Sequence, residues 1–129
     1  IYSVYMYICK MGYLAYSRAR GILRIQIRRK KMELETDIEK YFKRRVEKKG
    51  AWCPKWTSPG IRGVPDRLVF LPNGKIATVE MKRPKGGVVS KSQMKIAEKL
   101  RGLGHSVWRC YTKEEADYII FLFEELGWL

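Results

Sequence analysis

Apolar residues recur with the period of an α-helix in three parts of the chain, residues 33–50, 90–104 and 113–127. In the first part, Ile38, Phe42 and Val46 share one helical face. Thr36 is positioned to cap the start of this helix, with Glu39 three residues on completing a capping box. Glycines at the ends of all three parts are typical helix stops. The pattern therefore predicts three helices, each with one buried face.

Four shorter segments between turn signals are rich in β-branched and aromatic residues and predict strands at residues 51–60, 67–71, 75–82 and 105–111. The first strand should lie at an edge of the sheet, because Pro54 cannot donate a ladder hydrogen bond. A helix connects the last two strands, which favours a parallel pair with a right-handed crossover. The order α-β-β-β-α-β-α therefore predicts an α/β fold, a mixed β-sheet flanked by helices.

The turn sequence LPNGK, residues 71–75, fixes the register of the hairpin on either side of it. Pro72 suits the second position of a type I turn, and Gly74 suits the left-handed residue that follows. The resulting three-residue loop pairs Phe70 with Ile76 across the strands. A two-residue Asn-Gly loop would shift this register by one residue. We expect the three-residue form because of Pro72.

Three charged residues lie at the open end of this hairpin. In the expected register Asp66 is opposite Glu80, and Lys82 lies two residues further along the same face. Two carboxylates this close repel one another unless a positive charge neutralises them. A divalent cation that prefers hard oxygen ligands, Mg²⁺ or Mn²⁺, would do so. The alternative is that Lys82 forms salt bridges with both acids at a strand end.

The composition is globular, with 46% hydrophobic and 31% charged residues, but the net charge is +14. Such an excess favours nucleic acid or an anionic membrane surface as the partner. Three widely spaced cysteines without a C-x-x-C pair, together with a single histidine, argue against a zinc site and against a disulfide framework. We therefore expect reduced thiols in a cytoplasmic protein.

The motifs around the hairpin occur in a fixed order. A helix with glutamates precedes the segment S-P-G-x-x-G-x-P-D, and E-x-K and S-x-x-Q follow it. This order resembles the PD-(D/E)xK nuclease superfamily and, within it, the VRR-NUC family of virus-type replication-repair nucleases. The resemblance covers nearly all of residues 33–126. It implies a restriction-endonuclease-like fold and a metal-dependent phosphodiesterase.

By this resemblance, Asp66 and Glu80 bind the metal, Mg²⁺ or Mn²⁺, with the Met81 carbonyl as a further ligand. Lys82 positions or activates the attacking water and offsets phosphate charge. This assignment has a physical basis, because a bound divalent cation lowers the pKa of water and stabilises the negative charge of the transition state.

Two further residues match family positions but also have structural interpretations. Gln93 is the family's downstream residue, yet with Ser90 it also forms the pattern of a helix capping box. The family's helical glutamate is either Glu35 or Glu39. At about 100° per residue Glu35 lies nearer the buried face, so we assign Glu35 to the site. The alternative is a solvated acid at the helix end.

The expected substrate is DNA, and small members of the resembled family suggest a homodimer acting on branched DNA such as four-way junctions, in phage or bacterial replication or repair. Basic residues in the loops and helix start beside the hairpin end would contact phosphates without reading sequence, namely Lys55, Arg62, Arg83, Lys85, Lys91 and Lys95. The rival function is a non-catalytic nucleic-acid-binding module with the same fold.

Residues 1–31 differ from the rest, with eight Lys or Arg and no acid. Their apolar run is interrupted by Lys10 and is shorter than the ~20 residues of a membrane span, so we expect no membrane partner. The chain begins with Ile, Met32 directly precedes the first helix, and RRKK is what a purine-rich ribosome-binding stretch would encode. We expect a basic extension that is not native, followed by a nuclease domain at residues 32–129. The alternatives are a basic arm that extends the DNA surface or completes a dimer, and a membrane-surface segment.

Overall fold

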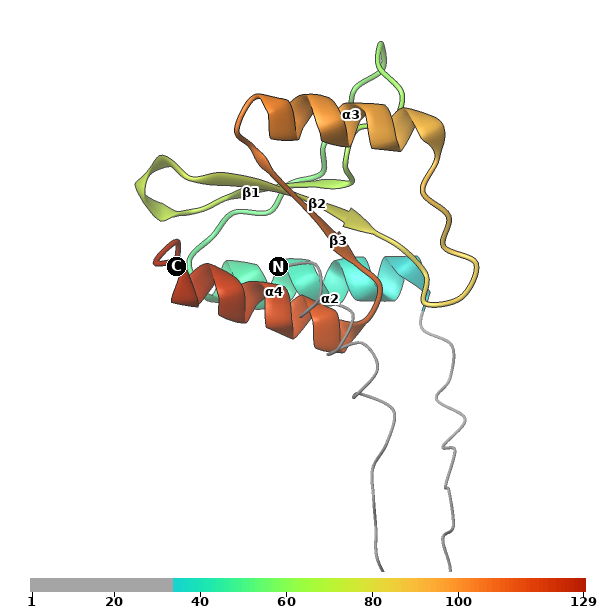
Figure 1. Ribbon diagram of the computed structural model, residues 1–129. Helices are drawn as coiled ribbons and strands as arrows, with labels where there is room; N and C mark the ends of the chain where they lie inside the picture. The colour runs from blue at the N-terminus through green and yellow to red at the C-terminus, as the bar shows by residue number, and fades with distance from the viewer. Residues whose placement is uncertain (1–33) are drawn as a thin grey trace, which may run out of the picture. The chain divides into compact units, whose positions relative to one another are not determined.

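The computed structural model describes residues 34–129, so the expectations for residues 1–31 lie outside the described residues. Its elements in chain order are α2 (Glu35–Lys48), β1 (Arg67–Phe70), the 3-10 turn η1 (Pro72–Gly74), β2 (Ile76–Met81), α3 (Lys91–Gly102), β3 (Ser106–Cys110) and α4 (Lys113–Glu125). The sheet lies between two layers of helix, with α3 on one face and α2 and α4 on the other (Figure 1). This arrangement confirms the α/β fold.

The sheet has the order β1-β2-β3, with β1 antiparallel and β3 parallel to the central strand β2. Phe70 pairs with Ile76 and Leu68 with Thr78, which is the expected hairpin register. The parallel pair is joined through α3, as the strand–helix–strand order predicts. Because the pair is antiparallel, Asp66, which directly precedes β1, lies beside the end of β2, where the expected register puts it opposite Glu80.

The expected fourth strand at residues 51–60 is wrong. This segment makes only two isolated antiparallel bridges, Trp52 to Phe70 and Lys55 to Arg67. Between them Pro54 has no N–H to donate. The Cys53 N–H lies on the side away from β1 and donates to the Glu47 carboxylate at 3.1 Å. The segment therefore lies along the edge of β1 without forming a continuous ladder.

Two local expectations are also wrong. The hairpin loop has three residues, but Asn73 and Gly74 both have positive φ, of 61° and 77°. A type I turn requires negative φ at the first of these positions. Helix α2 begins one residue before Thr36, with Leu34 at the N-cap and no side-chain cap. Acids in the first turn, Glu35 and Asp37, interact favourably with the helix N-terminus in place of the hydroxyl cap.

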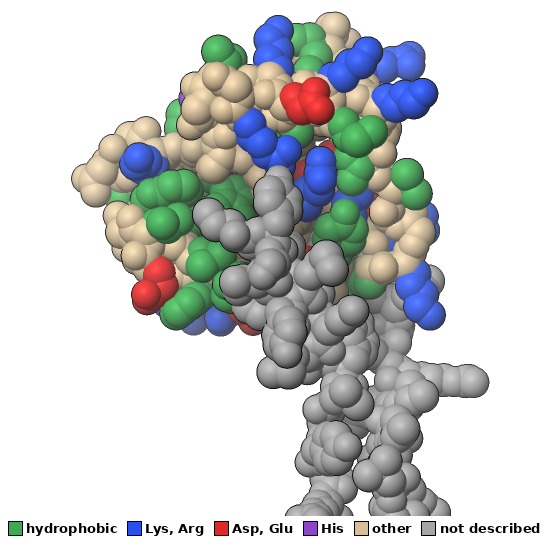
Figure 2. Space-filling model, in the orientation of Figure 1, with side chains coloured by type: hydrophobic (Ala, Val, Ile, Leu, Met, Phe, Trp, Pro, Cys, Tyr) green, Lys and Arg blue, Asp and Glu red, His purple; other side chains and the backbone are tan. Residues whose placement is uncertain are grey.

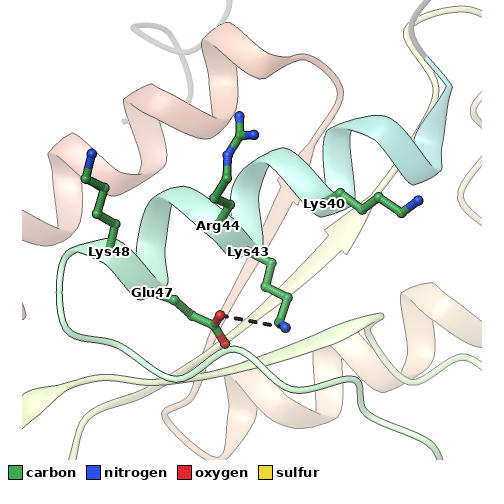
Figure 3. A pocket seen from close by; sticks show the side chains of 5 residues that line it. All are labelled: Lys40, Lys43, Arg44, Glu47 and Lys48. Atoms are coloured by element: carbon green, nitrogen blue, oxygen red, sulfur yellow. Dashed lines mark ion pairs between the residues drawn. The ribbon is translucent and has the colours of Figure 1, made fainter.

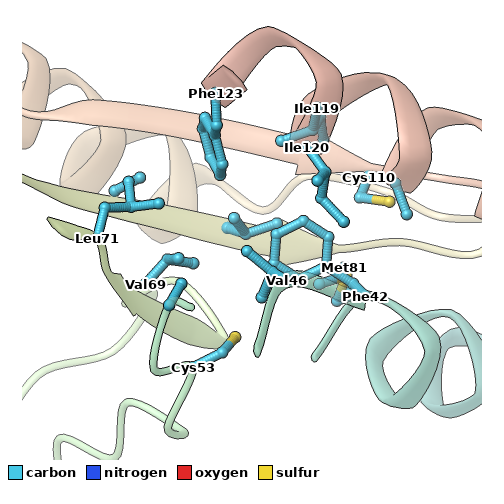
Figure 4. Close-up of a cluster of buried hydrophobic side chains, with 14 of the residues drawn as sticks. Phe42, Val46, Cys53, Val69, Leu71, Met81, Cys110, Ile119, Ile120 and Phe123 are labelled. Atoms are coloured by element: carbon cyan, nitrogen blue, oxygen red, sulfur yellow. The ribbon is translucent and has the colours of Figure 1, made fainter. Parts of the chain in front are cut away.

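The hydrophobic core fills the space between the sheet and the helix pair α2 and α4 (Figure 4). Phe42 and Val46 reach it from α2, and Ile119 and Phe123 from α4. Strand β2 is buried over nearly its whole length, because α3 covers its other face. Since side chains alternate along a strand, Met81 points into the core and its neighbours Glu80 and Lys82 point to the α3 side.

Two cysteines among the described residues, Cys53 and Cys110, are buried. Burial raises the pKa of the Cys53 thiol to about 12, so this group stays protonated. Over residues 34–129, no helix has the length and apolar character needed to cross a bilayer.

Candidate active site

Asp66, Glu80 and Lys82 gather at the end of the sheet beside the N-terminus of α3. Asp66 directly precedes β1 and accepts a hydrogen bond from the Met81 backbone N–H, with a distance of 2.7 Å between N and Oδ2. Glu80 and Lys82 are only 3% and 7% exposed. Such deep burial of two charged side chains is costly unless they have partners, and the partners are specific.

Burial is the largest influence on both carboxylates and raises the pKa of Asp66 and of Glu80 above their ordinary values. Asp66 also raises the pKa of Glu80, which shows that the two charges interact. Lys82 lowers the pKa of both acids, and the Met81 N–H lowers that of Asp66. The net direction is still upward, so the surrounding positive charge does not fully compensate the two carboxylates.

Lys82 is held in place by Gln93 at the start of α3. The Lys82 ammonium donates to Gln93 Oε1 at 3.0 Å. The same oxygen accepts from the Ser90 N–H at 2.9 Å, and the Gln93 N–H donates back to the Ser90 hydroxyl. Gln93 therefore closes the capping box and contacts Lys82 in one conformation. The two interpretations of Gln93 are compatible.

A close contact brings the loop before Asp66 against this helix start. Gly63 has a φ of +86°, and a Cβ built on it would lie 2.5 Å from the Ser92 carbonyl carbon and 2.7 Å from the Gln93 nitrogen. Only glycine fits such a backbone approach. Gly63 thus couples the Asp66 loop to the helix turn that holds Lys82.

The helical acids occupy different surroundings. Glu35 lies half-buried in the first turn of α2. Glu39 accepts from Arg67 Nε at 2.8 Å, lies 3.7 Å from the Lys55 ammonium, and raises the pKa of Asp66. Of the two helical acids, Glu39 is therefore the one whose charge acts on Asp66. Glu35 as the site glutamate stays a prediction, and Glu39 becomes the structurally better supported alternative.

Sequence reasoning missed Arg109. It stands opposite Glu80 in the parallel register of β3, and its Nε lies 3.4 Å from Glu80 Oε2. The guanidinium lowers the pKa of Glu80, although less than burial raises it. The segment HSVWRCY gives one signal, a cation within an otherwise apolar strand. Only the register of β3 against β2 identifies its partner, and the sequence does not fix that register.

The six basic residues predicted to contact DNA are all exposed. Arg83 and Lys85 follow β2, Lys91 and Lys95 lie on the first turns of α3, and Arg62 lies in the Gly63 loop. Lys and Arg side chains gather over α3 in the space-filling view (Figure 2). The structure thus surrounds the buried charges with exposed cations, and their contact with DNA stays a prediction.

The residues present fit a divalent cation. Among the described residues, no group of three or more His, Cys, Asp and Glu side chains is arranged to hold a metal. The predicted set is different, with two carboxylates, Asp66 and Glu80, and the Met81 carbonyl. All of these are hard oxygen donors. Burial raises the pKa of both acids, and an added positive charge would lower it again.

Comparisons with known proteins show the class to which this chain belongs. No family model matches the chain. A solved structure described as "VRR_NUC domain" matches with a TM-score of 0.63 and 32% identity, over 67% of this chain and 92% of that one. The chain is also 49% identical, over 73 residues, to "Putative nuclease p44" of Acyrthosiphon pisum secondary endosymbiont phage 1. Those residues are 57% of this chain and 77% of that protein.

The fold and the matches define a nuclease of the α/β class. The chain belongs to the VRR-NUC family. The family resemblance drawn from the motif order is therefore confirmed.

Proposed function

We propose that this protein is a Mg²⁺- or Mn²⁺-dependent DNA endonuclease whose site is formed by Asp66, Glu80 and Lys82. The observation that carries the proposal is the electrostatic coupling of these three groups at one end of the sheet, two of them almost fully buried. A VRR-NUC fold with this set of groups is suited to phosphodiester hydrolysis, and the intact set argues against a binding module without activity.

Each side chain has a defined task in this proposal. Asp66 and Glu80, together with the Met81 carbonyl, would hold the cation. When bound, the cation supplies Lewis-acid stabilisation of the charge that develops on the phosphate. Lys82, held by Gln93, would donate a hydrogen bond to a phosphate oxygen or to the attacking water. Arg109 would keep the Glu80 carboxylate oriented in the sheet.

The finer parts of the proposal concern the substrate and setting. The net charge of +14 and the cations around the site support a polyanionic substrate. We propose that a homodimer acts on branched DNA such as four-way junctions, since a two-fold dimer matches a two-fold substrate. The relative from a phage supports a role in phage or bacterial DNA replication or repair, in the cytoplasm of the bacterial cell.

The test is a cleavage assay with labelled single-stranded, duplex, flap and four-way DNA, each with Mg²⁺, Mn²⁺ or EDTA. Asp66→Asn and Glu80→Gln should lose at least about 10²-fold in cleavage rate while keeping DNA binding. Asp117→Asn is the matched control, because this acid on α4 pairs with Tyr41 and Arg45 outside the site. Cleavage by either site variant at the unmodified rate would reject the assignment.

A further inference from the structure

A second cationic surface lies on α2, on the opposite side of the sheet from α3. It is a hollow lined by Lys40, Lys43, Arg44, Glu47 and Lys48 (Figure 3). Lys43 points toward Glu47, and their charged atoms lie 3.7 Å apart. We call the other three cations, Lys40, Arg44 and Lys48, the α2 track. They are spaced four residues apart, so they share one face of the helix.

Other cations on α2 and at its end form ion pairs with α4, Arg45 with Asp117 at 3.2 Å and the C-cap residue Lys49 with Glu124 at 2.6 Å. In the α2 track, Arg44 lies 5.7 Å from the Tyr41 ring centroid, a contact that leaves its charge without a carboxylate. Within residues 34–129, no carboxylate lies within ion-pair distance of any member of the α2 track. Like charges at this spacing destabilise a helix. The sequence thus keeps three mutually repelling cations at a cost to the helix.

The α2 track starts next to the candidate site. Lys40 follows Glu39, whose carboxylate lies 2.8 Å from Nε of Arg67, the residue after Asp66, and 3.7 Å from the Lys55 ammonium. From Lys40 the track runs along the helix to Lys48, a rise of about 12 Å. It therefore extends the cations at the site along a helix that the predicted DNA contacts do not include.

The chemistry of this surface favours nucleic acid over a membrane. An interfacial helix must insert an apolar face into lipid. The apolar face of α2 is fully buried in the core through Ile38, Phe42 and Val46. The exposed face of α2 therefore offers a partner only charged groups, and evenly spaced cations in a hollow match the phosphates of a nucleic-acid chain.

We propose that the α2 track binds the phosphate backbone of DNA that extends away from the active site. This inference rests on the proposed function, because it takes DNA as the molecule at the site. It deepens that function by requiring a substrate that reaches from α3, around the end of the sheet, to the outer side of α2. Two layers of about 10 Å separate these surfaces, which is roughly 6 bp of duplex. A shorter duplex would not contact both surfaces.

The experiment measures DNA binding without cleavage, using the full chain with Asp66→Asn in EDTA. The triple variant Lys40→Gln, Arg44→Gln, Lys48→Gln removes the track with residues that favour helix. The control variant Lys75→Gln, Lys99→Gln, Arg101→Gln removes the same charge from the hairpin turn and the end of α3. Melting temperatures measured in about 20 mM and about 200 mM salt verify that both variants fold.

On a duplex of about 24 bp, the track variant should reduce the slope of log K against log salt concentration by about 2–3, close to 0.9 for each lost contact. The control should change it by less than about 1.

Equal slopes for the track variant and the control on long DNA would overturn the inference and leave the nuclease proposal intact. Failure of the parent to bind any DNA would overturn both. Binding to phosphatidylserine vesicles that depends on the track, without an effect on DNA, would assign the surface to a membrane and overturn the inference as well.

Discussion

Gly63→Ala should separate the Asp66 loop from the start of α3. An alanine at a φ of +86° costs about 1–2 kcal/mol in backbone strain alone. The new Cβ would also lie 2.5 Å from the Ser92 carbonyl carbon, and backbone atoms cannot rotate away as side chains do. Overpacking of this kind costs about 1–3 kcal/mol more. The total expected loss in the free energy of unfolding is about 2–5 kcal/mol.

Gly104→Ala is the matched control for this change. Gly104 has the same φ of +86°, and a Cβ there would meet nothing within 4 Å. It should therefore lose only the strain of about 1–2 kcal/mol. Urea denaturation of the two variants measures the difference directly. At a temperature where both are folded, only Gly63→Ala should cut DNA more slowly, because displacement of the helix turn moves Gln93 away from Lys82.

Equal losses of unfolding free energy for the two variants would refute this reasoning. They would show that the loop does not pack against α3 and that Gly63 serves only its own backbone conformation. Unequal losses with equal cleavage rates would keep the packing and reject its effect on the site.

Three further predictions concern the site and the chain as a whole. Gln93→Ala and Ser90→Ala both remove the capping box, so each should lower the free energy of unfolding by about 1 kcal/mol. Only Gln93→Ala should slow cleavage, because Gln93 also contacts Lys82, and a normal turnover rate in Gln93→Ala would show that Gln93 has no role in the site. Burial raises the pKa of Asp66 and Glu80 in the folded, metal-free protein, so the stability they contribute is present at low pH and is lost as the pH rises through the raised values. The stability gained by Asp66→Asn in EDTA should therefore grow as the pH rises from about 4, the ordinary pKa of an aspartate, through the raised value, and a gain that is constant with pH would contradict this. A protein that starts at Met32 should fold and cut the same DNA as the full chain, as gel filtration and the cleavage panel would show; an insoluble or inactive product would make residues 1–31 structural.

The sequence predicted the hairpin register because one local feature determines it. A loop of three residues after Leu71 pairs Phe70 with Ile76 whatever the backbone angles within the loop. For that reason the register was correct even though the type I turn was wrong. The position of Asp66 relative to Glu80 depends only on this register, so the sequence was enough to predict that these two carboxylates lie opposite one another.

The remaining features depend on contacts distant in the chain. Glu35 and Glu39 are one turn apart, and helical periodicity alone did not identify Glu39 as the acid that Arg67 binds from a neighbouring segment. Arg109 acquires its partner through a parallel pairing across the α3 crossover. None of these contacts is encoded in a local pattern.

Binding of Mn²⁺ tests the central claim most directly, because it examines the proposed cation site without relying on turnover. Mn²⁺ titration followed by electron paramagnetic resonance should show that the unmodified protein removes free Mn²⁺ from solution. Asp66→Asn and Glu80→Gln should each weaken this binding by at least about 10²-fold, while Asp117→Asn binds as the unmodified protein does. Mn²⁺ binding that is unchanged in both site variants would contradict the account.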